Sequence, residues 1–369
     1  IACNLDVDLL SACLPLLETG VVGGMEWSFD ALFKQHYLLP EWFHDLLLAY
    51  SQEGRLVGHG VFFSLFSGRF STEQAAWLDR LRTLNKSYQF NHITEHFGFM
   101  TGSDFHKGAP LSVPFTNTTL AIGVDRISRI SDAAACPVGL ENLAFAYDLD
   151  EVKVQGEFLD ALITPVNGFI ILDIHNLYCQ IHNFEIDAQA ILNLYPLDKV
   201  REIHISGGSW EAHQDAPQQK ERRDTHDDAV PQEVFNLLQI ILPLCSNLKF
   251  VVMEQLGVAL KTDMQRIQYQ QDFQKMKVIV EQFNLQQIWI KEKKNFNPPS
   301  KLLLSHIPIH NEVLYEQQQF ISTVLETSDN AITAMQKLAK SALANSDWQI
   351  EKWQYTMLDT AIQIAQKWK

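Results

Sequence analysis

The stretch GFIILDIHN, residues 168–176, carries the pattern that decides the fold. Its apolar run ends at the polar residue Asp173, and a longer segment follows in which apolar residues recur at helical spacing. A short apolar run of this kind is typical of a buried strand in a parallel sheet, where a helix returns the chain to the opposite edge. The stretch therefore predicts a strand–helix unit with a polar side chain at the carboxyl end of the strand.

The same pattern, a short apolar run followed by a segment with helical spacing, repeats along the first 260 residues. Ser71-Thr72-Glu73-Gln74 is a capping-box pattern, and Pro231 lies where a first helical turn should begin. Strands that alternate with helices predict a parallel sheet with right-handed crossovers, and at this length a (β/α)8 barrel of the TIM type. A doubly wound open sheet is the alternative, and it would place the strand ends along one edge instead of around a ring. The eight strand candidates are residues 1–4, 22–27, 56–63, 88–97, 137–143, 168–176, 200–206 and 248–255.

The pattern breaks near residues 295–300, which read NFNPPS. The remaining residues are rich in Gln, Ala, Lys and Trp, and their apolar residues keep helical spacing. We therefore expect a barrel over residues 1–295 and a helical extension over residues 296–369. Two interpretations of the extension stay open: extra helices packed on the side of the barrel, or a docking module for a partner or a peptide.

Composition limits the class of protein. The 369 residues include 29 Lys and Arg against 44 Asp and Glu, a formal charge of −15, which disfavours nucleic-acid binding and suits the binding of cations. We expect no membrane span, because no apolar run approaches the roughly 20 residues required, and no secretory signal segment. The cysteines form no C-x-x-C pair, which argues against a disulfide scaffold and a zinc knuckle, so a reducing cytoplasm is the expected compartment. They are Cys3, Cys13, Cys136, Cys179 and Cys245.

Histidine or an acidic residue lies near the end of six successive strand candidates. A single case is usually a hydrogen-bonded edge residue, but buried carboxylates cost several kcal/mol each unless they are paired or bind metal, and clustered carboxylates repel one another. Bound metal is the simplest compensation, and this many ligands implies more than one ion. Imidazole and carboxylate ligands suit iron, manganese or zinc, and disfavour copper(I) and iron–sulfur clusters. The residues at these ends are His59, His96, Glu141, Asp173, His204 and Glu254.

Three further residues extend the candidate ligand set. Asn176 follows Asp173 by three positions, and Asp224 and His226 lie two apart in the long loop after the seventh strand candidate. A bridging carboxylate in such a set could hold two ions about 3.5–4 Å apart. His92 lies deeper in the barrel and is expected to be a core residue or to support the ligands. His175 should point away from Asp173 and is expected to support the ligands.

At these residues the sequence resembles the multinuclear non-heme iron-dependent oxidases, a family of TIM-barrel proteins that includes the methanobactin-biosynthesis oxidases and modifies ribosomal peptides. The resemblance covers roughly residues 1–260 and implies two or three iron ions in a mixed Fe(II)/Fe(III) state that activates dioxygen. The matching segments, in the order of the family, are HGVFFSLFSG (59–68), ITEHFGFMTG (93–102), GLENLAF (139–145), IILDIHNLY (170–178), REIHISGG (201–208), RDTHDDAVP (223–231) and MEQ (253–255).

The resemblance also implies the ligands and partners. The substrate would be a precursor peptide, modified at a cysteine or at an aspartate or asparagine, and a partner protein would recognise its leader. The sequence departs from the family by reading Asp-Ile-His-Asn where many relatives have Asp-Val-Asn-Asn, and by lacking the common tryptophan after Glu254. Neither change removes a ligand, but both put the family's substrate pocket in doubt. Carried over by position, the iron ligands are His59, His96, Glu141 as a plausible bridge, Asp173, Asn176, His204, Asp224, His226 and Glu254.

Two other functions remain compatible with the residues alone. A divalent-metal isomerase or a phosphodiester hydrolase on the same barrel would also gather His, Asp and Glu at strand ends. A non-catalytic peptide-binding scaffold could keep the ligands and act through the helical extension. The identity of the bound metal separates these classes.

Overall fold

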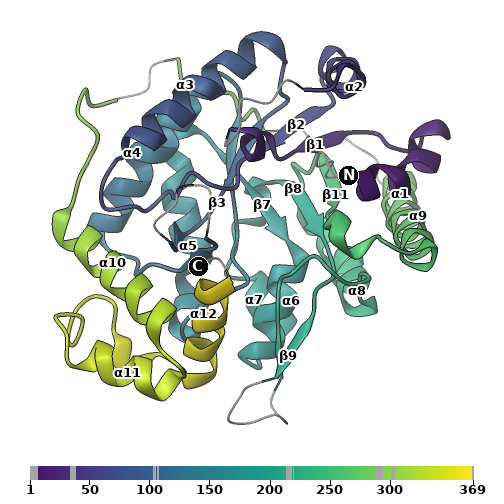
Figure 1. Ribbon diagram of the computed structural model, residues 1–369. Helices are drawn as coiled ribbons and strands as arrows, with labels where there is room; N and C mark the ends of the chain where they lie inside the picture. The colour runs from purple at the N-terminus through teal and green to yellow at the C-terminus, as the bar shows by residue number, and fades with distance from the viewer. Residues whose placement is uncertain are drawn as a thin grey trace.

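A barrel of parallel strands forms the body of the molecule. The computed structural model describes residues 7–33, 39–102, 105, 108–212, 218, 220–286, 294–300 and 304–367. Within these residues, seven parallel strands pair in the order β1-β2-β3-β6-β7-β8-β11 and curve into a nearly closed barrel (Figure 1). The strands are β1 Met25–Trp27, β2 Leu56–His59, β3 Ile93–His96, β6 Val138–Glu141, β7 Phe169–Asp173, β8 Val200–Ile205 and β11 Phe250–Met253.

The strand order confirms the TIM-type barrel. Each strand of this sheet pairs with the one before it along the chain, so the order contains no reversal of the kind that defines a doubly wound sheet. The first strand candidate, residues 1–4, lies outside the described residues.

Helices surround the barrel on its outer side (Figure 1). Neighbouring helices pack on one another, as α3 does on α4 and α4 on α5, and their apolar faces cover the strands. The helices of this part are α1 Val7–Glu18, α2 Glu41–Gln52, α3 Thr72–Ser87, α4 Asn117–Ala134, α5 Leu149–Ile163, α6 Ile174–Asn183, α7 Ala188–Leu192, α8 Gln232–Ile241 and α9 Asp263–Gln286. Two small antiparallel hairpins, β4 Phe99–Met100 with β5 Pro110–Leu111 and β9 Trp210–Ala212 with β10 Lys220–Arg222, project from loops.

Local hydrogen bonds explain where elements begin and end. The capping box at the start of α3 is confirmed, with Ser71 and Gln74 bonded reciprocally. The strand expected over residues 168–176 ends early, because the Asp173 carboxylate accepts a bond of 2.6 Å from the Asn176 N–H and starts α6 at Ile174. Pro231 is the residue before α8 rather than part of its first turn.

The C-terminal residues are helical, as expected, and comprise α10 Glu312–Thr327, α11 Ala331–Ala339 and α12 Tyr355–Lys367. They pack on each other and on the barrel: the Trp353 ring stacks on Tyr147 with centroids 3.6 Å apart, and the Gln318 side chain bonds the backbone of Phe66 at 2.8 Å. Two of the apolar residues at helical spacing in this segment, Val313 and Ile332, are 63% and 53% exposed. The domain boundary at residue 295 stays a prediction. Within the described part of the chain, no helix combines the length and the apolar character needed to cross a bilayer.

Candidate metal centre

The parallel register brings the predicted ligands to one end of the barrel. His96 on β3 lies opposite Glu141 on β6, and Asp173 on β7 lies opposite His204 on β8. Because each of these residues is at or near the carboxyl end of its strand, their side chains converge where TIM barrels place their active sites.

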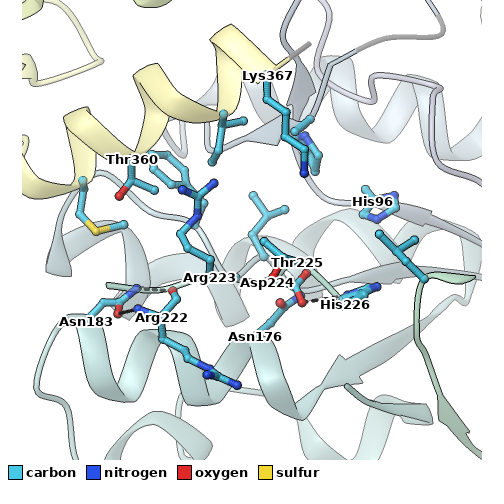
Figure 2. A pocket seen from close by; sticks show the side chains of 18 residues that line it. His96, Asn176, Asn183, Arg222, Arg223, Asp224, Thr225, His226, Thr360 and Lys367 are labelled. Carbon is cyan, nitrogen blue, oxygen red and sulfur yellow. Dashed lines mark hydrogen bonds and ion pairs between the residues drawn. The ribbon is translucent and has the colours of Figure 1, made fainter. Parts of the chain in front are cut away.

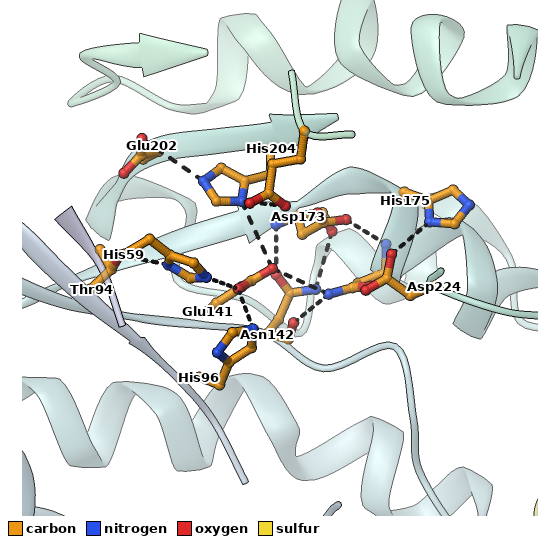
Figure 3. Close-up of polar contacts among 12 residues, drawn as sticks. His59, Thr94, His96, Glu141, Asn142, Asp173, His175, Glu202, His204 and Asp224 are labelled. Carbon is orange, nitrogen blue, oxygen red and sulfur yellow. Dashed lines mark hydrogen bonds and ion pairs between the residues drawn. The ribbon is translucent and has the colours of Figure 1, made fainter. Parts of the chain in front are cut away.

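Glu141 lies at the centre of this convergence (Figure 3). One carboxylate oxygen, Oε2, is 3.3 Å from His59 Nε2 and 3.5 Å from His96 Nε2. The other, Oε1, is 3.8 Å from His204 Nδ1 and 3.5 Å from Asn176 Nδ2. The two oxygens of one side chain therefore face two different groups of donor atoms, which is the arrangement a bridging carboxylate needs.

Those two groups each have the size of a metal site. The first consists of His59, His96 and Glu141, and the second of Glu141, Asp173, His204 and Glu254. Within each group, one donor atom per residue lies within 4.8 Å of all the others.

The histidines are held in orientations that suit ligation. His59 Nδ1 contacts Thr94 Oγ1 at 2.8 Å and His96 Nδ1 contacts the Gly60 carbonyl at 3.1 Å, so that both Nε2 atoms face Glu141. Bonds of this kind fix the ring and its tautomer in metal sites.

The loop after β10 adds Asp224 and His226. His226 Nε2 is 2.8 Å from Asp224 Oδ1 and 3.7 Å from Glu254 Oε2, so this pair joins the second group through Glu254. Two glycines after β8 let the loop approach: a Cβ at Gly207 would lie 2.2 Å from the Ala229 carbonyl oxygen, and one at Gly208 would lie 2.1 Å from that of Arg223. The lack of side chains at these glycines therefore lets the loop that carries Asp224 and His226 pass close to the end of β8. All nine predicted ligands thus belong to one contact network, although their role as ligands stays a prediction.

The electrostatics of the network favour a bound cation. Burial raises the pKa of the Asp173 carboxyl well above its usual range, and the negative charges of Asp224 and Glu141 raise it further. Burial lowers the pKa of His59, but the hydrogen bond to Glu141 and the charge of Glu26 outweigh burial and raise that pKa to about 10. Both raised pKa values mean that the network favours the binding of protons, and a metal cation would supply positive charge in the same place.

Buried oxygens without hydrogen-bond partners also indicate a cation site. Asp173 Oδ2 and Asn176 Oδ1 are buried and have no hydrogen-bond partner among the described residues. Buried oxygens without partners are costly, and a metal ion is a partner that both can accept. The residues present therefore fit a multinuclear centre with imidazole and oxygen ligands.

Supporting residues lie around the network, and sequence reasoning missed two of them. His175 Nδ1 contacts the predicted ligand Asp224 at Oδ1, 3.1 Å away, whereas His92 pairs deeper in the barrel with Glu202, which is outside the predicted ligand set. Glu26 and Glu202 were not anticipated: His204 Nε2 is 3.1 Å from Glu26 Oε2 and 3.8 Å from Glu202 Oε1. For Glu202 the sequence holds a usable signal: it lies two residues before His204 on the same strand, so the two side chains share a face. For Glu26 the signal is an acidic residue inside an apolar run, which does not distinguish an inward from an outward side chain.

Two pockets reach the network. A pocket of about 240 Å³ lies between His96, Asn176, Asp224 and His226 on one side and α12 on the other (Figure 2). A second pocket, of about 290 Å³, borders His59, His96, His226 and Glu254 from the side of β1 and is lined mainly by apolar residues such as Trp27. The network is therefore accessible to molecules from outside.

Comparisons with known proteins agree with this geometry. A UPF0276 protein of Paraburkholderia phytofirmans is 30% identical over 200 residues, which cover 53% of this chain and 62% of that protein. One of Rhizorhabdus wittichii is 27% identical over 213 residues, which cover 58% of this chain and 73% of that protein. The chain thus spans about three fifths of the length of the first relative.

A solved structure of an IolI protein with a bound zinc atom matches with a TM-score of 0.50 and 13% identity, over 76% of this chain and 98% of that one. At that identity the likeness shows the fold alone. Residues 28–268 match a family model described as RiPP precursor modification enzyme MbnB/TglH/ChrH, where RiPP denotes a ribosomally synthesised and post-translationally modified peptide. That span includes all nine residues of the network. The chain therefore belongs to the MbnB/TglH/ChrH family of RiPP precursor modification enzymes.

Proposed function

We propose that this protein is a multinuclear non-heme iron-dependent oxidase that uses dioxygen to modify a cysteine, or an aspartate or asparagine, in a ribosomally synthesised precursor peptide. The observation that carries the proposal is the network around Glu141. Its oxygens face two groups of donors, and the neighbouring atoms Asp173 Oδ2 and Asn176 Oδ1 have no partner among the described residues.

The positions of the residues support a role for each. Glu141 would bridge two ions, of which His59 and His96 would hold one and Asp173, Asn176, His204 and Glu254 the other. Asp224 and His226 would hold a third ion next to Glu254, which gives two or three ions in all. Iron in such a centre supplies the activation of dioxygen. His175 and Thr94 keep Asp224 and His59 in place through the bonds described above.

The peptide and its partner belong to the same proposal. The peptide residue to be modified enters one of the two pockets that reach the network, and a separate partner protein recognises the leader of the peptide. Family membership supports a precursor peptide as substrate. The reaction takes place in the cytoplasm, where ferrous iron and reduced thiols persist.

Elemental analysis of the protein purified without added metal tests this proposal. Two to three irons per chain, together with oxygen consumption in the presence of a precursor peptide, are the expected result. Zinc, manganese or magnesium as the main metal would favour a divalent-metal isomerase or hydrolase instead, unless iron reconstitution restores oxygen consumption. No bound metal after reconstitution would contradict every catalytic assignment. The remaining function would then be that of a non-catalytic peptide-binding scaffold.

Two alanine variants locate the centre within the chain. His204→Ala and Glu254→Ala each remove a donor of the second group, so both should lose iron and oxygen consumption while circular dichroism shows an unchanged fold. His306→Ala is the matched control, because this histidine is exposed and lies outside the network. Full iron occupancy with normal turnover in either test variant would refute the assignment.

A further inference from the structure

A buried arginine is connected to the network through a histidine. Arg222 is the last residue of β10, and only 4% of it is exposed. Its Nε donates to His175 Nε2 at 3.2 Å, and the other ring nitrogen of His175 lies 3.1 Å from Asp224 Oδ1 (Figure 3). The three side chains therefore form a continuous chain from a guanidinium group to a predicted metal ligand.

The direction of these bonds fixes the tautomer of His175. Arginine stays protonated and can only donate, so His175 Nε2 must accept. An imidazole that accepts at Nε2 carries its proton on Nδ1, and that N–H donates to Asp224 Oδ1. Without Arg222, the proton could move to Nε2, and Asp224 would then lose this donor. The orientation of the Asp224 carboxylate therefore depends on Arg222.

Arg222 is itself held in place by α6 and by the hairpin. The Asn183 side chain accepts from the Arg222 backbone N–H at 2.8 Å and donates to its carbonyl at 3.0 Å (Figure 2). The guanidinium carbon lies 5.6 Å from the ring centre of Tyr178 and 5.1 Å from that of Trp210, both within the range of cation–π contacts. The group that directs His175 is therefore fixed before any metal binds.

The other end of the chain is arranged for an ion. His226 Nε2 lies 2.8 Å from Asp224 Oδ1, yet this buried nitrogen has no hydrogen bond among the described residues. His226 has a φ of 52°, a strained conformation that a residue other than glycine keeps only where its surroundings hold it. The Leu256 N–H donates to its carbonyl at 2.9 Å. A nitrogen and an oxygen held close together without a hydrogen bond suit two ligands of one ion.

We propose that Arg222 is a positioning residue for the third metal position. Through His175 it holds the Asp224 carboxylate where Asp224 and His226 bind one ion together. The inference rests on the proposed function, which assigns a third ion to these two ligands, and it adds a residue outside the predicted ligand set. Partners of this kind orient a ligand, and their loss typically weakens metal binding about 10- to 100-fold.

Nuclear magnetic resonance of the metal-free protein tests the tautomer. The nitrogen chemical shifts of isotope-labelled histidines report which ring nitrogen carries the proton, and the signals missing from His175→Ala identify His175. We expect the proton on Nδ1 in the wild type and a mixture of tautomers in Arg222→Met. A wild-type proton on Nε2 would overturn the inference without the need for any variant of Arg222.

Metal affinity tests the consequence of this positioning. Fe(II) is titrated anaerobically against a competing chelator, and the ions bound per chain are counted. Arg222→Met should weaken the third ion about 10- to 100-fold and keep the two ions around Glu141, which also shows that the variant is folded. Removal of a positive charge would by itself tighten the binding of a cation. Weaker binding therefore reports the lost positioning and not the lost charge.

The chain offers a matched control for this variant. Arg201 Nε also donates to a buried histidine, His92, at 3.3 Å, but that histidine pairs with Glu202, outside the predicted ligand set. Arg201→Met should therefore leave the affinity of all three ions unchanged. An equal loss of the third ion in both arginine variants would overturn the inference.

A double variant tests whether Arg222 acts through His175. His175→Ala alone should weaken the third ion about as much as Arg222→Met does, and the double variant should lose no more than either. A further loss in the double variant, unchanged affinity in Arg222→Met, or a wild type that binds no third ion would each overturn the inference.

The outcome is separable from that of the proposed oxidation. A third ion whose affinity depends on Arg222, found in a protein that consumes no oxygen with a precursor peptide, would support the positioning role and contradict the oxidase. Oxygen consumption by a protein whose metal affinity is the same in the wild type and in Arg222→Met would do the reverse.

Discussion

The barrel buries histidine and carboxylate side chains in two places, and the histidines in the two places have different surroundings. In the pair below the network, His92 Nε2 lies 2.6 Å from Glu202 Oε2, and His92 Nδ1 accepts a bond of 3.3 Å from Arg201 Nε. Both ring nitrogens thus have partners. In the network around Glu141, by contrast, Asp173 Oδ2 has no partner among the described residues. The His92 ring is therefore fully bonded, whereas the network keeps buried oxygens without partners. Glu202 connects the two places, because its Oε1 also lacks a bond among the described residues and lies 3.8 Å from His204 Nε2.

The protonation states reflect this difference. Burial lowers the pKa of His92 and outweighs the opposite effect of Glu202, so its imidazole stays neutral. In the network, the surrounding carboxylates outweigh burial and raise the pKa of His59 to about 10. A neutral histidine next to one carboxylate needs nothing further, whereas several carboxylates around a protonated histidine indicate a place for metal cations. Substitutions in the two places are therefore expected to change the free energy of unfolding in opposite directions.

The largest expected effect is that of metal on stability. Because iron binds the folded network and not the unfolded chain, each ion should add about 4 kcal/mol to the free energy of unfolding at a free concentration a thousand times its dissociation constant. Anaerobic thermal unfolding with and without Fe(II) measures this gain. Asp173→Asn should lose much of it, while Glu202→Gln should keep it. An equal gain in both variants would contradict the distinction between the two places.

The next effect concerns the metal-free protein. Glu202→Gln replaces a charged acceptor of the His92 N–H with a neutral one, and bonds to charged groups contribute about 1.5–3 kcal/mol. We expect the free energy of unfolding, measured by urea denaturation with a chelator present, to fall by about 2 kcal/mol. Unchanged stability would mean that the bond between His92 and Glu202 contributes little to the free energy of unfolding.

Asp173→Asn should have the opposite sign in the same experiment. Asparagine preserves the cap of α6, since it serves this position as well as aspartate does. It also removes a carboxyl whose pKa burial and neighbouring carboxylates raise, so folding no longer has to bury its charge or take up a proton. The metal-free variant should therefore be more stable than the wild type by about 1 kcal/mol. Substitutions that remove a destabilising residue from a functional site commonly have this effect. A loss of stability would show that the Asp173 carboxylate is already compensated without metal.

Much of this contrast was accessible from the sequence, for a physical reason. Parallel strands end at the same edge of a barrel, so polar residues that close apolar runs, such as His96 and Glu141, can be placed together without knowledge of the packing. Glu202 lies inside its strand, two residues before His204, so the alternation of side chains along a strand places it on the same face. The sequence therefore contained this signal, but a search limited to residues at strand ends did not use it. The position of α12 beside the pocket depends on contacts between residues far apart in the chain, such as Trp353 with Tyr147, which no local pattern encodes.

The most gradual expected effect is the pH dependence of the two histidines in the metal-free protein. The pKa of His92 is lowered from 6.5, so the unfolded chain takes up a proton that the folded protein does not, and stability falls as the pH drops below 6.5. The pKa of His59 is raised to about 10, so its contribution is complete below 6.5 and is lost as the pH rises toward 10. Each group contributes a slope of at most about 1.4 kcal/mol per pH unit to the free energy of unfolding.

His92→Asn should flatten the acid side of the curve of stability against pH, and His59→Asn should flatten the alkaline side, as measured by urea denaturation between pH 5 and pH 10. Because bound metal would replace the proton on His59, iron loading should flatten the alkaline side alone. Flattening of both sides by iron would place His92 in the metal centre as well.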